Sequence, residues 1–330
     1  MHTIINSITS VRNFCNPPGW QIAFEWEEDL SDILCVKLDF YNLQNYARIN
    51  SFIVNSEYKH LHPIVQNIDS NTSLVLFFSI FDSIYFILEN KHNFIPIIMD
   101  FWKQDLDHFQ YFFSNFSLIY TISKEIAEMA NIRYQTNAFK YFPMCISKRW
   151  SVDYTPFKSV DIIQIGRINP LLHQYTLDLV KEYPEIEYVY AKTINGQKIY
   201  FSTQKGKLGI IETRNDLMNL YRMAKISLVS PPGMNNDSRN TNGIHPVSAR
   251  FLESIISFCH IIGVYPENED FNYFEMSSIC NNVRDYAHFK TSVLQYLHEP
   301  FNKMNLYKHF LQKHYVEDRA KQIVLDIRNL

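Results

Sequence analysis

From residue 70 onward, short apolar runs rich in β-branched and aromatic residues alternate with longer runs whose apolar residues recur at helical spacing. This alternation is typical of a parallel sheet whose strands are joined by crossover helices. In the first half, strands are expected at 73–78, 94–99, 117–122 and 139–144, and helices at 81–89, 106–113 and 124–130, the last capped by Ser123. Before residue 70 the pattern is less regular, with strands expected at 33–38 and 51–54.

A polar, irregular stretch between Cys145 and Ser159 interrupts the alternation, which then restarts. The stretch predicts a linker between two α/β domains, residues 1–148 and 159–300. In the second domain, strands are expected at 160–165, 187–191, 208–212 and 225–229, and helices at 171–183, 215–224 and 247–259, with a polar loop over 230–244. Residues 285–330 predict two more helices. The fold class is therefore α/β, with two doubly wound halves in tandem.

Glycine is scarce, and this excludes several kinds of site. The chain has only 8 glycines among 330 residues, and no G-x-G-x-x-G, no Walker A loop and no G-x-S-x-G can be built from them. The usual dinucleotide fingerprint, the phosphate loop of NTPases and the nucleophile elbow of serine hydrolases are thus absent. Other ways of binding a phosphate-bearing ligand remain open.

Charge and cysteine spacing bear on partners and location. The net charge is −3 with no basic block, so nucleic acid is not expected as a partner. The 5 cysteines form no C-x-x-C, which favours a reducing compartment over a disulfide framework. The N-terminus lacks the basic start and apolar core of a signal peptide, so we expect a cytoplasmic protein.

The first candidate binding signal is the turn that follows the strand expected at 160–165. There Gly166 and Arg167 come just before a helix. Ligands of open α/β sheets bind beyond the carboxyl ends of strands, where a glycine lets the backbone approach a phosphate and an arginine supplies charge. Alternatively, the pair is a tight turn with a solvated charge.

The second signal is the helix start after the long polar loop. Ser248, Arg250 and Glu253 fall in its first turns, where free backbone N–H groups and the positive end of the helix suit a diphosphate. A partly exposed carboxylate one turn deeper, at Glu253, would accept two ribose hydroxyls. Alternatively, this is an ordinary amphipathic helix with a favourable acid near its N-terminus.

Together, these signals resemble the GT-B glycosyltransferases, in particular the bacterial group one or family four enzymes. The resemblance spans residues 73–274 and rests on six segments in the family's order: 95–100 (IPIIMD), 117–125 (SLIYTISKE), 139–143 (FKYFP), 165–167 (IGR), 219–230 (NLYRMAKISLVS) and 248–253 (SARFLE). It implies two Rossmann-like domains facing a cleft, with C-terminal helices over 301–330 packing back toward the N-terminal domain. It also implies catalysis without a bound metal or other cofactor, because fixed positive groups stabilise the leaving diphosphate.

The resemblance assigns roles to individual residues. Glu253 would bind the ribose of a UDP- or GDP-sugar donor, and Arg250 would reach the diphosphate or brace Glu253. The remaining donor-binding residues would border the phosphates or line the nucleobase pocket: Gly166, Arg167, Ser230 and Ser248.

Two positions depart from the family pattern. Leu172 and His173 stand where the family places a lysine after the Gly-Arg turn, and His245 stands at the first of its two glutamates. A protonated His173 would partly replace the lysine, and a neutral His245 would still hydrogen-bond a sugar hydroxyl. We therefore count His173 among the donor-binding residues and His245 among the catalytic ones.

On the acceptor side, Asp100 at the end of a strand is the candidate base, although it also suits the cap of the following turn. His60 and His62 have metal-like spacing but no third ligand nearby, so no metal site is expected.

The primary hypothesis is a metal-independent hexosyltransferase that moves sugar from a nucleotide-sugar to a glycan or lipid-linked acceptor of bacterial surface polysaccharide, with peripheral contact at the inner membrane face. The alternatives are a non-catalytic scaffold or partner subunit, and a nucleotide-sugar isomerase of the same fold.

Overall fold

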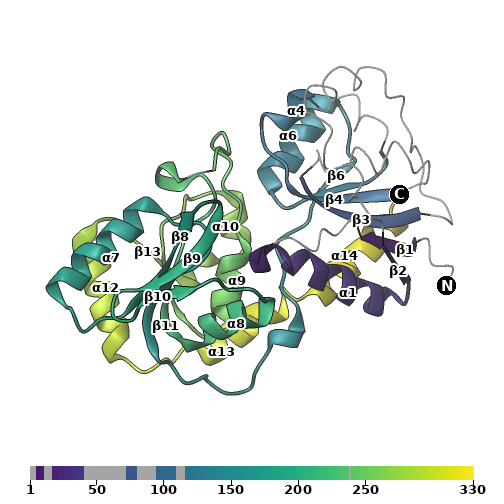
Figure 1. Cartoon of the computed structure of the whole chain (residues 1–330). Helices are drawn as coiled ribbons and strands as arrows, with labels where there is room; N and C mark the ends of the chain where they lie inside the picture. The colour runs from purple at the N-terminus through teal and green to yellow at the C-terminus, as the bar shows by residue number, and fades with distance from the viewer. Residues whose placement is uncertain (1–4, 11–16, 41–71, 80–93, 109–115, 238) are drawn as a thin grey trace. The chain divides into compact units, whose positions relative to one another are not determined.

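The computed structural model describes residues 5–10, 17–40, 72–79, 94–108, 116–237 and 239–330. The chain divides into two compact units. Unit 1 comprises residues 1–16, 22–144 and 316–330, and unit 2 comprises residues 17–21 and 145–315. Each unit contains one sheet (Figure 1).

The sheet of unit 1 has the strand order β2-β1-β3-β4-β5-β6, and every neighbouring pair is parallel. Its strands are β1 (Ile5–Ser10), β2 (Lys37–Phe40), β3 (Thr72–Ser79), β4 (Phe94–Asp100), β5 (Ile119–Thr121) and β6 (Phe139–Tyr141). The described helices are α1 (Ile22–Leu34), α4 (Asp105–His108), α6 (Lys124–Tyr134) and α14 (Val316–Arg328). This is the doubly wound arrangement that the alternation predicts.

The last helix of the chain, α14, belongs to unit 1. It packs on α1, and two hydrogen bonds join it to the sheet. The Tyr120 hydroxyl donates to Asp326 Oδ2 at 3.0 Å, and Gln322 Nε2 donates to the Tyr141 carbonyl at 2.7 Å. The long segment 145–315 belongs to unit 2, and the chain returns from it to unit 1 at Val316.

Several sequence predictions for unit 1 are confirmed. β3, β4, β5 and β6 lie where strands are expected, and Ser123 caps α6 by accepting a hydrogen bond from the Ile126 N–H. The strand predicted at 33–38 is displaced: α1 continues through Leu34, the chain turns at Cys35, whose φ is 53°, and the strand β2 begins only at Lys37. The helix at 81–89 and the strand at 51–54 lie outside the described residues, as does the end of the helix at 106–113.

The sheet of unit 2 has the order β10-β9-β8-β7-β11-β12-β13. Its strands are β7 (Val160–Gln164), β8 (Tyr188–Ile194), β9 (Gln197–Ser202), β10 (Gly206–Gly209), β11 (Ala224–Val229), β12 (His260–Gly263) and β13 (Cys280–Asn282). Its α-helices are α7 (Pro170–Glu182), α8 (Arg214–Met223), α9 (Ala249–Ile256), α10 (Glu269–Tyr273), α11 (Met276–Ile279), α12 (Tyr286–His298) and α13 (Met304–Gln312). Short 3-10 helices lie at η1 (Pro18–Trp20), η4 (Lys148–Trp150) and η5 (Met234–Asn236).

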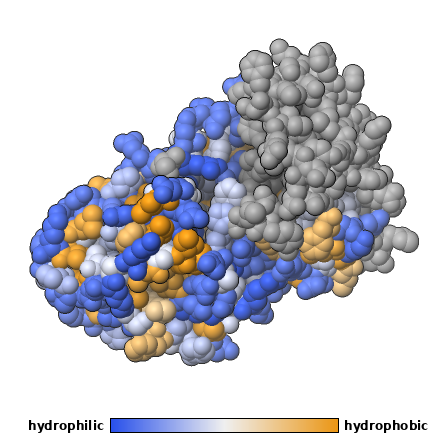
Figure 2. Space-filling model, in the orientation of Figure 1, coloured by the Kyte–Doolittle hydropathy of each residue, from blue (hydrophilic) through white to orange (hydrophobic). Residues whose placement is uncertain are grey.

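Two antiparallel strands extend the parallel sheet. β9 forms a hairpin with β8, and β10 pairs with β9 as the edge strand. Asn195 and Gly196, with φ of 51° and 78°, form the tight turn between β8 and β9. Hydrophobic side chains gather over this part of unit 2 in Figure 2, where Leu208 and Ile210 are exposed.

Most predicted elements of unit 2 are confirmed, with several differences. β9, β12 and β13 are additional strands, α10 and α11 are additional helices, and the strand expected at 208–212 lies at Gly206–Gly209. The helix expected at 247–259 is the shorter α9, because His260 begins β12. Three helices rather than two follow residue 285.

The core of unit 2 lies between its sheet and the helices α7 and α12. It contains Leu172 and Leu179 of α7 and Phe289 and Val293 of α12, packed on apolar residues of β7, β11 and β12. α9 contacts both α8 and α13. The loops at the carboxyl ends of β7 and β11 therefore begin from strands that are packed in the core.

Candidate functional site

The topology of unit 2 places a switch point at the carboxyl ends of β7 and β11. These strands are parallel neighbours, with Ile162 opposite Ile226. The chain crosses from β7 through α7 to β8 on one side, and from β11 through α9 to β12 on the other. Crossovers that leave in opposite directions create the switch point where open α/β sheets bind ligands. The loops 165–169 and 230–248 border it.

Arg250 ties these two loops together. Its Nη1 donates to the Arg167 carbonyl at 2.8 Å, and its Nη2 donates to the Ser230 carbonyl at 2.9 Å. Gly166 has a φ of 78°, and a Cβ there would lie 3.6 Å from Arg250 Cδ. The turn after β7 therefore rests directly on the arginine. Both acceptors are uncharged carbonyls, so neither hydrogen bond neutralises the charge of Arg250 at the switch point.

Arg167 is also held in place. Its Nε lies 2.7 Å from Asp237 Oδ2, and the Asp237 side chain is 1% exposed. The other oxygen of Asp237 accepts hydrogen bonds from the backbone N–H groups of Gly233 and Arg239. The polar loop after β11 thus fixes the arginine that precedes α7.

Glu253 is buried, with 2% of its side chain exposed, and forms an ion pair with Arg214 of α8, which is 7% exposed. The expectation of a partly exposed carboxylate is therefore wrong. Tyr221 lies beside this pair, and burial, followed by the negative charge of Glu253, raises the pKa of its hydroxyl. Glu253 therefore has a structural partner that sequence reasoning missed.

Tyr200 of β9 is a second missed neighbour. Its hydroxyl lies against the Gly166 backbone, and burial raises its pKa to about 12. It is 5% exposed. The Asn-Gly turn signals a hairpin, but only the register of β9 on β8 brings Tyr200 to the switch point.

The N-terminus of α9 lacks a side-chain cap. Ser248 stands at the N-cap position with extended backbone, yet its side chain makes no capping hydrogen bond. Its Oγ is buried and has no hydrogen-bond partner among the residues that the structure describes. Within the described residues, the first two N–H groups of α9 and the Ser248 hydroxyl are therefore available to an anion, whereas the Phe251 N–H donates to the Ser248 carbonyl. Ser230 is buried at the adjacent strand end.

His245 lies in the polar loop beside Gly233. Its Nδ1 is 2.7 Å from the Pro232 carbonyl, so Nδ1 carries the proton and Nε2 is the nitrogen that can accept. Gly233 has a φ of 79°, and a Cβ there would overlap Thr241 Oγ1 and lie 3.2 Å from His245 Cε1. The glycine permits the close approach that positions the histidine.

His173 turns toward an aromatic cluster. Its Nδ1 lies 2.9 Å from the Tyr188 hydroxyl, and its ring contacts Tyr190 at a centroid distance of 4.8 Å. Burial and the nearby charge of Lys192 lower its pKa, so the ring is neutral at pH 7. This geometry argues against a protonated His173 replacing the missing lysine.

The structure gathers Gly166, Arg167, Ser230, Arg250 and Glu253 around one switch point, with Ser248 and His245 in the adjoining helix start and loop. Asp100 ends β4 in unit 1 and is opposite Ser79 in the sheet register. His60 and His62 lie outside the described residues.

Within the described ranges, no group of three or more His, Cys, Asp or Glu side chains is arranged to hold a metal ion. None of the described helices has the length and apolarity to cross a membrane.

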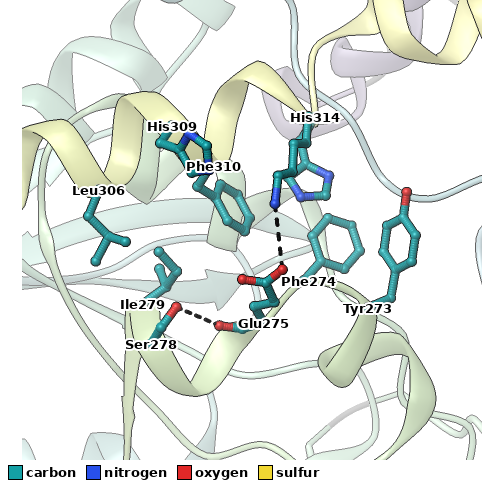
Figure 3. A pocket seen from close by; sticks show the side chains of 10 residues that line it. Tyr273, Phe274, Glu275, Ser278, Ile279, Leu306, His309, Phe310 and His314 are labelled. Carbon is teal, nitrogen blue, oxygen red and sulfur yellow. Dashed lines mark hydrogen bonds and ion pairs between the residues drawn. The ribbon is translucent and has the colours of Figure 1, made fainter.

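A separate cavity of about 150 Å³ lies between α10, α11 and α13. Figure 3 shows Phe274, Phe310 and His314 gathered at it, and the Phe274 and His314 rings stack at 4.5 Å. The Lys313–Glu275 ion pair spans it at 3.6 Å. Because α11 leads into the amino end of β13, this cavity is distinct from the switch point at the carboxyl ends of β7 and β11.

No family model matches the chain, and no curated protein matches it significantly in sequence. Solved structures do match it. A protein from Listeria monocytogenes described as a UDP-N-acetylglucosamine 2-epimerase is similar at a TM-score of 0.52 and 9% identity, over 98% of this chain and 96% of its own. The UDP-GlcNAc 2-epimerase from Neisseria meningitidis bound to UDP-GlcNAc is similar at 0.50 and 10% identity, over 99% and 100%.

A chain of a GtfA/B complex is similar at a TM-score of 0.48 and 12% identity. The match covers 85% of the present protein but only 61% of the length of the GtfA/B chain. The two full-length matches show the fold alone: two Rossmann-like α/β domains of the GT-B type.

Proposed function

We propose that unit 2 binds the nucleoside diphosphate of a nucleotide sugar at the switch point between β7 and β11, and that the protein is a glycosyltransferase. The observation that carries this proposal is Arg250, whose guanidinium donates, within the described residues, to the Arg167 and Ser230 carbonyls at the switch point. The uncapped start of α9 and the glycine turn at Gly166 lie beside it. A fixed positive charge with free backbone N–H groups suits a phosphate.

In this proposal, the phosphates accept hydrogen bonds from the Ser248 hydroxyl and the first N–H groups of α9. Arg167 and Arg250 stabilise the negative charge that develops on the leaving diphosphate, which removes the need for a resident metal. Because both arginines are already fixed by protein contacts, they need little reorganisation when the bond to the sugar breaks.

We retain the proposed contact between Glu253 and the ribose, although the ion pair with Arg214 limits how the carboxylate can bind. One of its oxygens is bound to Arg214, so the other must serve the ribose hydroxyls. Ser230 would line the nucleobase pocket. Proton transfer or sugar positioning would fall to Asp100 and His245, the latter through Nε2.

We propose a glycan or lipid-linked acceptor of bacterial surface polysaccharide as the second substrate, a UDP- or GDP-hexose as the donor, and a cytoplasmic location at the inner face of the membrane. The resemblance to group one, family four glycosyltransferases supports these assignments.

A nucleotide-sugar isomerase is the second candidate. It is favoured by the full-length structural similarity to proteins described as UDP-N-acetylglucosamine 2-epimerases. A non-catalytic partner subunit is the third, because the family's lysine and first glutamate are replaced by Leu172 and His245 at or near their positions.

The test begins with a thermal-shift screen against UDP, GDP, ADP, CMP and TDP and their sugar conjugates, since a ligand that binds only the folded state raises its stability. The stabilising conjugate is then incubated with the protein alone. Slow release of free sugar and nucleoside diphosphate supports a transferase, whereas a new nucleotide sugar identifies an isomerase. Binding without turnover, even with acceptor glycans, identifies a subunit, and no stabilisation by any of them overturns the nucleotide site.

A further inference from the structure

The β8–β9 hairpin brings a lysine to the switch point from a distant part of the sequence. Lys198 lies opposite Thr193, and Tyr200 lies opposite Ala191, so these two side chains share one face of the hairpin. Tyr200 on that face lies against the Gly166 backbone. Lys198 is therefore on the side of the hairpin that faces the turn after β7.

The electrostatics of Lys198 agree with this placement. The residue is exposed overall, while protein atoms crowd its ammonium group. This desolvation, together with the positive charges of Arg250 and Arg167, lowers its pKa. Lys198 makes no hydrogen bond or ion pair within the described part of the chain, so nothing there offsets its repulsion from the arginines.

The charges at the switch point do not balance. Arg167 is paired with Asp237, and Arg214 with Glu253. Neither Arg250 nor Lys198 forms an ion pair in the part of the chain that the structure describes, and the carboxylates that also act on Arg250, those of Asp237 and Glu253, are each already paired with another arginine. These six groups together carry two positive charges in excess. An anion with about two negative charges would neutralise them, as a diphosphate ester does.

We propose that Lys198 is a phosphate-binding residue that completes a cation cluster with Arg167 and Arg250 and makes the switch point selective for nucleoside diphosphates over nucleoside monophosphates. This inference rests on the proposed nucleotide site and names its ligand class. Lys198 thereby supplies from β9 the charge that Leu172 and His173, at the start of α7, do not.

The same hairpin offers a matched control. Lys192 lies opposite Ile199 and so points to the other face, where its ammonium is 5.4 Å and 5.3 Å from the centroids of the Tyr190 and Phe201 rings. A Lys192→Ala variant removes the same charge from the same hairpin without touching the cluster.

The test is calorimetric titration of wild type, Lys198→Ala, Lys198→Arg and Lys192→Ala with UDP, UMP and uridine, and with GDP, GMP and guanosine. We expect Lys198→Ala to lower diphosphate affinity by at least about tenfold, with a smaller loss for the monophosphate and none for the nucleoside. Lys198→Arg should retain most of the affinity, and Lys192→Ala all of it. Equal diphosphate affinity in wild type and Lys198→Ala overturns the inference and leaves the nucleotide site standing.

A second measurement needs no variant. Acylation of lysines by an amine-reactive reagent, read by mass spectrometry, should be slowed at Lys198 by saturating UDP or GDP and unchanged at Lys192. Binding with undiminished labelling of Lys198 contradicts the inference. Failure of wild type to bind any of the six ligands refutes the nucleotide site itself, and the role of Lys198 with it.

Discussion

The buried ion pair between Arg214 and Glu253 leads to a specific prediction about stability, because it gives Glu253 a structural role. The two side chains are 7% and 2% exposed. Removing one partner leaves the other charge without compensation in a low-dielectric site. Such losses cost about 3–5 kcal/mol of unfolding free energy. We therefore expect Arg214→Met to destabilise the protein by about that amount, and Glu253→Met to do the same.

The double variant Arg214→Met/Glu253→Met distinguishes a true pair from two independent sites. Apolar side chains of similar volume often replace a buried pair at little cost, so the double variant should be more stable than either single one. The assay is urea-induced unfolding followed by tryptophan fluorescence. The reasoning is refuted if each single variant loses less than about 1 kcal/mol, or if the two losses simply add.

Three further predictions concern other sites. Burial lowers the pKa of His260 to about 4; because the unfolded chain binds this proton near pH 6.5, unfolding free energy should fall by up to roughly 3 kcal/mol as the pH drops from about 6.5 to 4. His260→Phe should flatten the dependence of unfolding free energy on pH in urea titrations, whereas the exposed control His298→Gln should leave it unchanged. The same pH dependence in His260→Phe as in wild type would contradict the assignment. Gly233→Ala should weaken nucleotide binding in calorimetry, because its methyl group would displace Thr241 and His245; unchanged affinity would exclude this loop from the site. Arg167→Ala should weaken UDP by about tenfold or more but leave uridine unchanged, and equal losses for both would remove Arg167 from the phosphates.

The fold was predictable where the sequence has strong periodicity. Buried parallel strands such as β4 and β7 appear as continuous apolar runs between turn signals, and α7 begins where Pro170 follows the capping residue Asn169. β9 was missed because its first residues are exposed and polar, so that no long apolar run marks it, and β12 because its four residues continue the apolar pattern of α9.

The site was predictable only in its local parts. Gly166, Arg167 and the start of α9 follow from strand ends and helix starts, which are properties of short segments. The partners of these residues were not predictable, because Arg214 meets Glu253 across 39 residues and Arg167 meets Asp237 through a loop without a regular pattern. His173 was expected to carry charge, and only its tertiary burial and the nearby charge of Lys192, which lower its pKa, show why it does not.

The most direct test of the nucleotide site is amide hydrogen exchange of the wild-type protein with and without the nucleoside diphosphate that stabilises it. The account predicts slower exchange in two segments, residues 165–169 after β7 and residues 248–252 at the start of α9. Protection confined to residues 273–279 and 306–314, around the separate cavity, or no protection anywhere at saturating ligand, would contradict it.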